Sequence, residues 1–247
     1  MTTLSKKTVP LLLILGLFLS GCAISQAQET PASVTTTSKP VDTEWQEEFD
    51  FSNCTLSTEG RNDYFVLEPG FQLVLEGGNE VLVISVLDET IEIDGTMTRV
   101  IEEREWRNGE LIETSRNFFA ICEETKDVFY YGEEVDMYTG GVLSSHSGAW
   151  RAGLDDARAG LIMPGTPVVG MKYYQEVAPG VAMDRAEVLS LEDTISTPAG
   201  NFPNALLMKE GTALNLLERE FKTYAPGIGL IQDQNLLLTE YGFIDSE

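Results

Sequence analysis

Tight-turn dipeptides between apolar-rich runs constrain the fold of this chain more than any other feature. Asp94-Gly95 and Asn108-Gly109 are pairs that adopt positive φ at little cost, and such pairs typically close two-residue β-hairpins. The segment 71–77 alternates apolar and polar residues, which is the period of a strand with one buried face. The segment 80–89 is apolar at both parities, so we expect both of its faces to be covered.

Further short runs of this kind continue to the end of the chain. They predict an all-β fold: a single antiparallel meander of about ten or eleven strands, curled into a half-barrel, barrel or sandwich. Few or no helices are expected, since only residues 44–52 and 205–220 could hold a short one. Residues 44–247 contain no Pro/Gly/Ser-rich linker and no fixed-period repeat. They therefore predict one β-rich domain.

Proline-glycine pairs occur four times, at Pro69-Gly70, Pro164-Gly165, Pro179-Gly180 and Pro226-Gly227. Proline presets φ for the first central position of a type II turn, and glycine supplies the positive φ of the second. A phosphate-binding loop is the functional alternative, but it requires a strand-to-helix context and further glycines that are absent here. The four pairs therefore predict turns that lead into strands.

The N-terminus has the pattern of a bacterial secretory signal. Two lysines precede a mostly apolar run that is too short to span a bilayer. Leu19–Cys22 (LSGC) resembles the lipobox, which implies a signal peptide at 1–21 and a Cys22 that carries acyl chains such as palmitate. Ala23 follows in place of the aspartate that favours inner-membrane retention. A plain secretory signal with a chance cysteine is the alternative.

Residues 22–43 are rich in Thr, Ser, Pro and Gln and poor in large apolar residues. Such a segment cannot bury enough surface to fold, so it predicts a disordered tether. The anchor and tether together predict a protein of the bacterial cell envelope that contacts the membrane through its lipid. The periplasmic face of the outer membrane is favoured if the host has two membranes.

The charge balance excludes several partners. The formal net charge is −24, with 40 acidic and 16 basic residues, and loss of two lysines with the signal makes it −26. Such a surface repels nucleic acid and anionic headgroups, while the dispersed acids are typical of a solvated face. Segments 133–138 and 154–158 carry carboxylates without calcium-loop spacing, so no metal or cofactor is predicted.

Two cysteines remain beside Cys22. Cys54 and Cys122 would lie in an envelope that is oxidising in many bacteria, where an even pair often forms a disulfide. Buried thiols are equally common in protein cores. The sequence leaves both alternatives open.

The single histidine marks the segment that is richest in candidate site residues. If 142–150 is one strand, His146 and Trp150 share a face and Ser145 lies on the other. No Gly-x-Ser-x-Gly elbow is present, and no ligand pair has a zinc-binding spacing. The histidine is therefore expected to be structural or ligand-lining, and no catalytic residue is assigned.

The segment 152–170 is expected to be the longest one without a strand, and it would cap the open end of the sheet. Arg151 is expected to pair with Asp155 or Asp156 within it. Aromatic and basic side chains near this segment complete the set of candidates for lining a ligand site: His146, Trp150, Arg151, Arg158, Tyr173 and Tyr174.

Four sequence blocks carry a resemblance to a known family. They lie at 64–77, 145–165, 173–193 and 221–233 and include the elements Gly-Ala-Trp-Arg-Ala-Gly and Tyr-Ala-Pro-Gly-Ile-Gly. Their order resembles that of a family of functionally uncharacterised bacterial lipoproteins. The second element is also similar to the end of periplasmic lipoprotein-carrier domains, which implies a curved antiparallel sheet. Neither resemblance implies a reaction.

These features together predict a lipid-anchored envelope protein that binds an apolar or amphipathic ligand in a concave β-sheet. The sequence identifies no protein partner. One alternative is a structural or partner-binding lipoprotein without a pocket, and another is a hydrolase that uses the His146 region. A well-formed apolar cavity would distinguish the first prediction from the second.

The lipid anchor can be tested directly. A Cys22→Ser variant should leave the membrane fraction and become soluble, because Cys22 alone follows the apolar run through LSG. A Cys54→Ser, Cys122→Ser double variant keeps the anchor and should remain with the membranes. Retention of Cys22→Ser in membranes after a high-salt wash would show that the anchor is assigned to the wrong residue.

Overall fold

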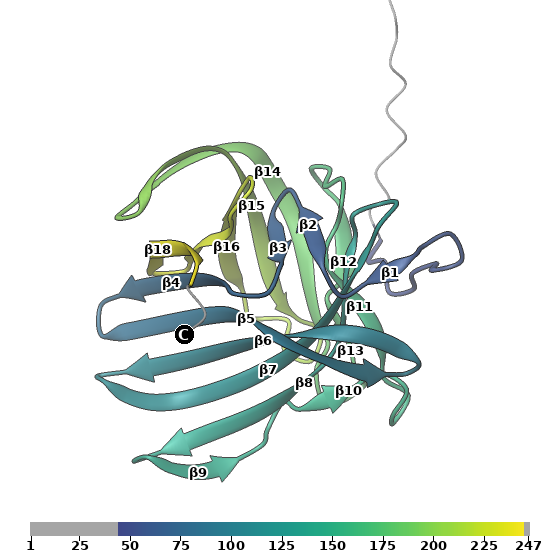
Figure 1. Cartoon of the computed structure of the whole chain (residues 1–247), viewed down its shortest axis with the longest axis horizontal. Helices are drawn as coiled ribbons and strands as arrows, with labels where there is room; N and C mark the ends of the chain where they lie inside the picture. Colours follow the sequence, from purple (N-terminus) through teal and green to yellow (C-terminus); the bar gives the residue numbers. More distant parts are fainter. Residues whose placement is uncertain (1–43, 245–247) are drawn as a thin grey trace, which may run out of the picture. The chain divides into compact units, whose positions relative to one another are not determined.

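One large antiparallel sheet organises residues 44–244, the part of the chain that the computed structural model describes (Figure 1). The expected signal peptide, Cys22 and tether lie outside these residues. The strands are β1 (Leu56–Ser57), β2 (Gly60–Asn62), β3 (Phe65–Leu67), β4 (Phe71–Gly77), β5 (Glu80–Ile93), β6 (Thr96–Arg107), β7 (Glu110–Cys122), β8 (Val128–Thr139), β9 (Val142–Ser145), β10 (Trp150–Arg151), β11 (Arg158–Met163), β12 (Lys172–Tyr174), β13 (Glu176–Val177), β14 (Asp184–Thr197), β15 (Gly200–Thr212), β16 (Glu220–Ala225), β17 (Gly229–Asp233) and β18 (Leu236–Phe243).

The all-β prediction is confirmed, but the predicted strand number is wrong. Eighteen strands are present among the described residues, sixteen of them in the main sheet. Turns and irregular pairings divide several runs that read as one strand, and the short strands before residue 70 have too few residues to show a period. Within residues 44–244 no helix is long and apolar enough to cross a membrane.

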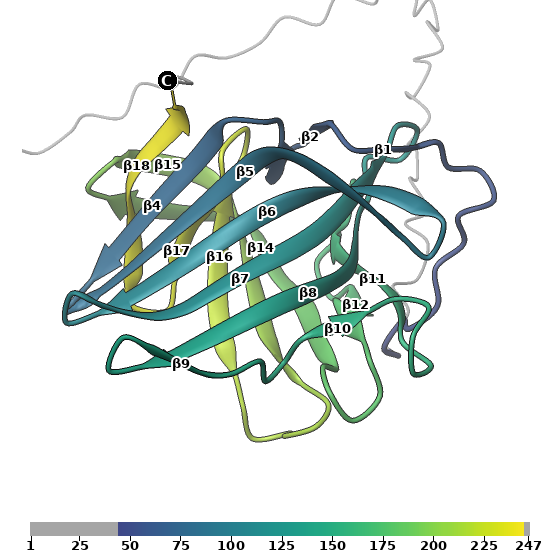
Figure 2. The same cartoon turned by 60° about the horizontal axis from the view of Figure 1, so that its bottom comes forward.

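The sheet consists of two meanders that join edge to edge. Strands β4 to β8 pair in sequence order, and so do β14 to β18, while β18 pairs with β4. Figure 2 shows β4 to β8 crossing in front of β14, β16 and β17, so that the two groups form opposite walls. The predicted curled meander is therefore confirmed in its coarse form.

Residues 172–177 nearly close this sheet into a barrel. Strand β12 pairs with β14 at one edge, and β13, which follows directly in the chain, pairs with β11 at the other. Between them, the backbone N–H of Gln175 donates a hydrogen bond of 2.7 Å to the backbone carbonyl of Asp184. One extended segment thus satisfies backbone groups on both edges of the sheet, which would otherwise be unpaired.

The predicted hairpin turns are confirmed. Asp94-Gly95 has φ values of 49° and 74°, and Asn108-Gly109 has 55° and 79°, as a two-residue turn with two positive φ angles requires. The first pair joins β5 to β6 and the second joins β6 to β7. These are the longest paired strands of the first meander.

Three of the four proline-glycine pairs have the predicted backbone. Gly70, Gly180 and Gly227 have φ values of 83°, 77° and 77°. The prediction for Gly165 is wrong, because this residue does not have a positive φ. A Cβ atom there would lie 1.8 Å from the Thr125 carbonyl oxygen. Close contact between two backbone segments, and not a positive φ, requires glycine at that position.

The expectations for residues 142–170 need correction. Strand β9 ends at Ser145 and β10 begins at Trp150, so 142–150 is not one strand. The segment 152–170 is not strand-free either, because it contains β11, which pairs with β8 and β13. It therefore extends the sheet, and does not simply cap it. The positive φ of Asp155 and Asp156 places a tight turn just before β11.

The two possible helices are also absent. Residues 44–52 form no helix, and residues 205–212 belong to β15. Within β15 the even-numbered residues Leu206, Met208 and Glu210 are buried, whereas Leu207 and Lys209 between them are more exposed, which is the period of a strand.

A hairpin contacts both meanders, and a disulfide joins the segment before β1 to one of them. The β2–β3 hairpin contacts β7 on one wall and β17 on the other, so it crosses between the meanders. Cys54 and Cys122 are joined in a disulfide with a Cα–Cα distance of 5.4 Å. This bond links the segment before β1 to the end of β7, and Phe51 packs on Phe129 beside it with ring centroids 4.6 Å apart.

The turn at Gly227 provides a test of the backbone assignment. A Gly227→Val variant should lose about 1 to 3 kcal/mol of unfolding free energy through backbone strain alone, because no heavy atom lies within 4 Å of the added Cβ position. Gly227→Asn should lose less, since asparagine tolerates positive φ better. Denaturant unfolding measures both, and equal stability of Gly227→Val and wild type would contradict the turn.

Candidate binding cavity

The curled sheet encloses a cavity of about 670 Å³. This volume lies within the range of small-molecule sites, about 300 to 1,000 Å³. Alternation along the strands determines which side chains reach it. On β6 the odd-numbered residues Ile101, Glu103 and Glu105 line the cavity, and on the neighbouring β7 Glu113 and Ser115 do so.

One part of the wall is apolar. Its side chains come from the β2–β3 hairpin, from β4 and β5, and from the start of β6: Phe65, Val66, Phe71, Leu73, Leu82, Ile84, Val86 and Ile101. Phe119 on β7 stacks on Tyr130 with ring centroids 4.7 Å apart, and both also border the cavity. A ligand with an apolar portion would lie against this surface.

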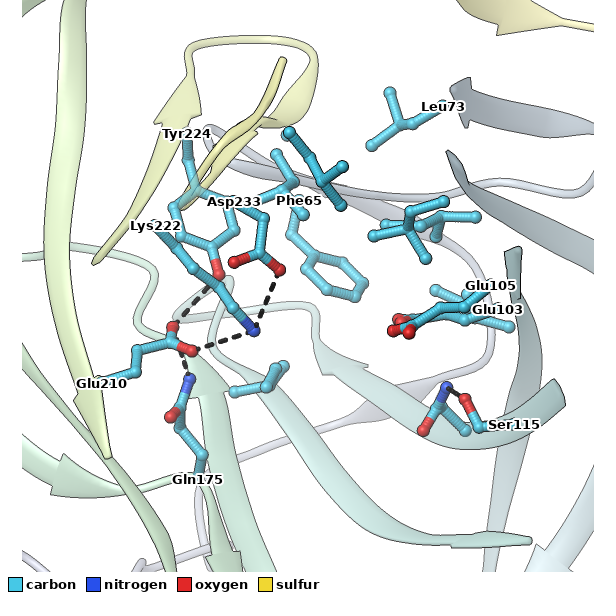
Figure 3. A pocket seen from close by; sticks show the side chains of 18 of the residues that line it. Phe65, Leu73, Glu103, Glu105, Ser115, Gln175, Glu210, Lys222, Tyr224 and Asp233 are labelled. Carbon is cyan, nitrogen blue, oxygen red and sulfur yellow. Dashed lines mark hydrogen bonds and ion pairs between the residues drawn. The ribbon is translucent and has the colours of Figure 1, made fainter. Parts of the chain in front are cut away.

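A lysine and its acidic partners form a polar cluster on the opposite wall (Figure 3). Lys222 Nζ lies 3.2 Å from Glu210 Oε2 and 3.7 Å from Asp233 Oδ2. Glu210 Oε1 accepts hydrogen bonds from Gln175 Nε2 at 3.0 Å and from the Tyr224 hydroxyl at 3.2 Å. The neighbouring Glu210 carboxylate raises the pKa of Lys222 well above its ordinary value, so this lysine is a fixed cation and not a nucleophile.

Glu103 and Glu105 point into the same space from β6, as Figure 3 shows. Burial raises the pKa of Glu103 to about 7, and the nearby carboxylates of Glu105, Asp233 and Glu113 add to the shift, while Lys222 opposes it. Glu105 lies directly opposite Glu113 in the β6–β7 register. Two like charges in that position repel each other, and the pKa of each is raised mainly by burial.

A second acidic group is formed by Glu133 on β8 and Glu176 on β13. Burial raises the pKa of Glu133 to about 8, and Glu103 contributes to this shift. Glu176, whose exposure is 9%, accepts a hydrogen bond of 3.4 Å from Trp150 Nε1. Burial, followed by the charge of Glu133, raises the pKa of Glu176 well above its ordinary value. Near neutral pH this part of the cavity therefore holds protons that a solvated carboxylate would release.

Carboxyl groups dominate the whole lining. Ten acidic side chains but only two basic ones, Arg107 and Lys222, border the cavity. Arg107 Nε is bonded to Glu80 Oε1 at 2.6 Å. The cavity can therefore accept cations or hydrogen-bonding neutral groups, and it repels anions.

None of the six residues predicted to line a ligand site borders this cavity. Trp150 is buried at 6% exposure and Tyr173 is fully buried, so both are core residues, and Tyr174 packs edge-on against Trp45. Arg151 pairs with Glu134 and not with the expected Asp155 or Asp156, and Arg158 pairs with Glu47. These six candidates therefore lie outside this cavity.

His146 is exposed, with 65% of its side chain accessible. Its Nδ1 lies 2.8 Å from Asp136 Oδ1 and 2.9 Å from the Val135 carbonyl. Ser144 Oγ donates to the Met137 carbonyl at 3.0 Å, so its hydroxyl is directed away from the imidazole. Trp150 is not beside His146 on a shared strand face, because a turn separates β9 from β10.

The sequence contains one indication of the acidic wall, which is the parity of Glu103 and Glu105. Glu103 and Glu105 have the same parity as Ile101, which faces the core. The alternate positions 102 and 104 are also charged, and a strand charged at both parities does not indicate which face is inside. Only the curvature of the sheet places these carboxylates inside.

The described residues contain one group with potential metal ligands, formed by Cys54, Cys122 and Glu124. The two sulfur atoms are bonded to each other and are not thiolates. This group therefore lacks the ligands that a zinc site requires.

The raised pKa of Glu103 makes stability depend on pH. Its pKa is about 7 in the folded protein against 4.5 ordinarily, so the folded state binds more protons between these values and the unfolding free energy falls as pH rises through that window. Glu103→Gln removes the ionisation and should stabilise the protein by about 1 to 3 kcal/mol at pH 8, with little effect at pH 4. Glu92→Gln, at an exposed position, is the control. Equal stability of Glu103→Gln and wild type at pH 8 would contradict the pKa shift.

Comparisons with known proteins show no family membership. No protein-family model matches the chain, and no curated protein matches its sequence. Among solved structures, a crystal structure described as a "putative lipoprotein from Parabacteroides distasonis ATCC 8503" aligns with a TM-score of 0.35 and 11% identity. The alignment covers 74% of this chain and all of that one. A likeness at this level carries no inference about fold or function.

Proposed function

We propose that this chain is a lipid-anchored protein of the bacterial cell envelope that binds an apolar or amphipathic small ligand inside its barrel. The observation that carries the proposal is the cavity of about 670 Å³, which has an apolar surface on one side and a polar cluster on the other. A structural or partner-binding protein without a pocket has no need of such an interior.

The lining supports binding in a second way. Ionisable side chains inside a barrel cost stability unless they are paired, and apolar side chains of similar volume would fill the space at lower cost. The presence of many carboxyl groups in the cavity therefore supports a binding site maintained by selection, and argues against a defect in packing.

The anchor part of the proposal rests on the LSGC element and the tether at 22–43. Acylation at Cys22 would hold the barrel at a membrane, since each buried methylene contributes about 0.8 kcal/mol. The strongly acidic chain would be repelled by anionic headgroups. We place the protein at the periplasmic face of the outer membrane if the host has two membranes.

The hydrolase alternative finds less support. The imidazole of His146 has an acidic partner in Asp136, but this pair is exposed, and the nearby Ser144 hydroxyl is bonded to a backbone carbonyl. A triad requires a nucleophile in contact with the imidazole, and among the described residues no hydrogen bond joins a serine to His146.

Filling the cavity tests the binding function. Ile84 lines the cavity, whereas Val83, its neighbour on β5, does not. An Ile84→Trp variant should lose the ligand that wild-type protein retains when purified from its own host, because the added ring occupies the apolar side of the cavity. Native mass spectrometry detects the retained ligand, and fluorescence of the neutral dye N-phenyl-1-naphthylamine reports on the cavity directly.

Val83→Trp is the matched control, with the same substitution on the opposite face of the strand. It should retain the ligand and bind the dye like the wild type, and circular dichroism should show that both variants are folded. Two results would overturn the proposal: no ligand or dye bound by the wild type, or equal binding by Ile84→Trp.

A further inference from the structure

The basic groups in the cavity already have acidic partners. Arg107 is bonded to Glu80, and Lys222 is shared between Glu210 and Asp233. An anionic ligand would have to displace a carboxylate from one of these two cations. The cavity therefore presents no free positive charge to a carboxylate, sulfate or phosphate group.

The acidic groups, by contrast, exceed the bases. Seven of the ten carboxyl side chains that border the cavity form no ion pair within the described part of the chain. They come from separate strands, with Glu103 on β6, Glu133 on β8 and Glu176 on β13, so they are brought together by the closure of the barrel and not by a run of acidic sequence.

An atom inside the cavity wall also lacks a partner. Asp233 Oδ1 is buried and accepts no hydrogen bond, although the other oxygen of the same carboxyl group contacts Lys222. A buried acceptor without a donor destabilises the folded protein. Asp233 borders the cavity, but this oxygen has almost no accessible surface, so it is a cost of the acidic lining and not a contact point for the ligand.

The surroundings of the acidic groups define the rest of the ligand. Phe119 and Tyr130 border the cavity next to Glu133, and aromatic faces attract cations at short range. The apolar surface of Phe71, Leu73 and Ile84 would accommodate a hydrocarbon portion. The cavity thus has complementary regions for the two parts of a cationic amphiphile.

We propose that the ligand of this cavity is an amphipathic organic cation, with a protonated amine held among the carboxylates of β6, β8 and β13 and an apolar chain packed along β4 and β5. This inference rests on the proposed binding function and specifies its ligand class. When the cation binds, the carboxyl groups lose their protons and pair with the amine. Neutral or anionic amphiphiles of the same length bind more weakly.

Three probes with the same ten-carbon chain test the proposal: decylammonium, decanol and decanoate. In calorimetric titrations of the untethered domain, decylammonium should bind at least tenfold more tightly than decanol, and decanoate should show no binding. Glu103→Gln with Glu133→Gln should weaken decylammonium binding about tenfold and leave decanol binding unchanged, since removing two carboxylates affects only the charged headgroup.

A matched double variant controls for total charge. Glu92 and Glu240 are exposed and lie outside the cavity lining, so Glu92→Gln with Glu240→Gln should bind all three probes as the wild type does. Equal affinity of the wild type for decanol and decylammonium would overturn the cationic ligand but leave the binding function intact. Absence of binding by all three probes would overturn both. The wild-type series decides the question even if a variant fails to fold.

Discussion

Closure of the sheet by residues 172–177 is the constraint on which the rest of the structure depends. Because β12 pairs with β14 and β13 pairs with β11, the two meanders acquire an inside and an outside. The odd-numbered carboxyl groups of β6 lie on the inner face. Closure surrounds them with protein and so creates both the cavity and its unusual electrostatics.

The carboxyl groups inside this barrel distinguish it from a barrel whose interior side chains serve only to stabilise the fold. Small barrels normally fill their interior with apolar side chains, as the β4 and β5 side of this one does. The other side retains Glu103, Glu105 and Glu113 on adjacent strands, although Glu105 and Glu113 face each other directly. Residues that oppose folding in this way are typical of functional sites.

The sequence predicts the strands well where local chemistry decides the structure. Asp94-Gly95 and Asn108-Gly109 fix their hairpins through backbone preference alone, and the alternation at 71–77 identifies the buried face, since Phe71, Leu73 and Leu75 are all buried. The candidate site could not be predicted in the same way. Its carboxyl groups come from both meanders, which only the long-range pairing of β18 with β4 and of β13 with β11 brings together.

The residues chosen from the sequence lie outside this cavity for a related reason. His146, Trp150 and Arg151 drew attention because they are rare or concentrated in one segment, but local concentration does not reveal which way a strand faces once the sheet curls. Trp150 is a core residue, and its indole N–H reaches Glu176 at the cavity wall. Trp150 is therefore hydrogen-bonded to a residue that lines the cavity, although it does not line the cavity itself.

If the chain is anchored at Cys22 as we propose, the disulfide between Cys54 and Cys122 has a mechanical consequence. Tension applied along the chain from its N-terminal side first meets the backbone hydrogen bonds of Gln46 with Lys172 and Tyr174, which can shear and re-form. Beyond them the covalent bond at Cys54 transfers the load to the end of β7, in the middle of the first meander. Because β7 also lines the cavity, the disulfide couples the N-terminal segment covalently to one wall of the binding site.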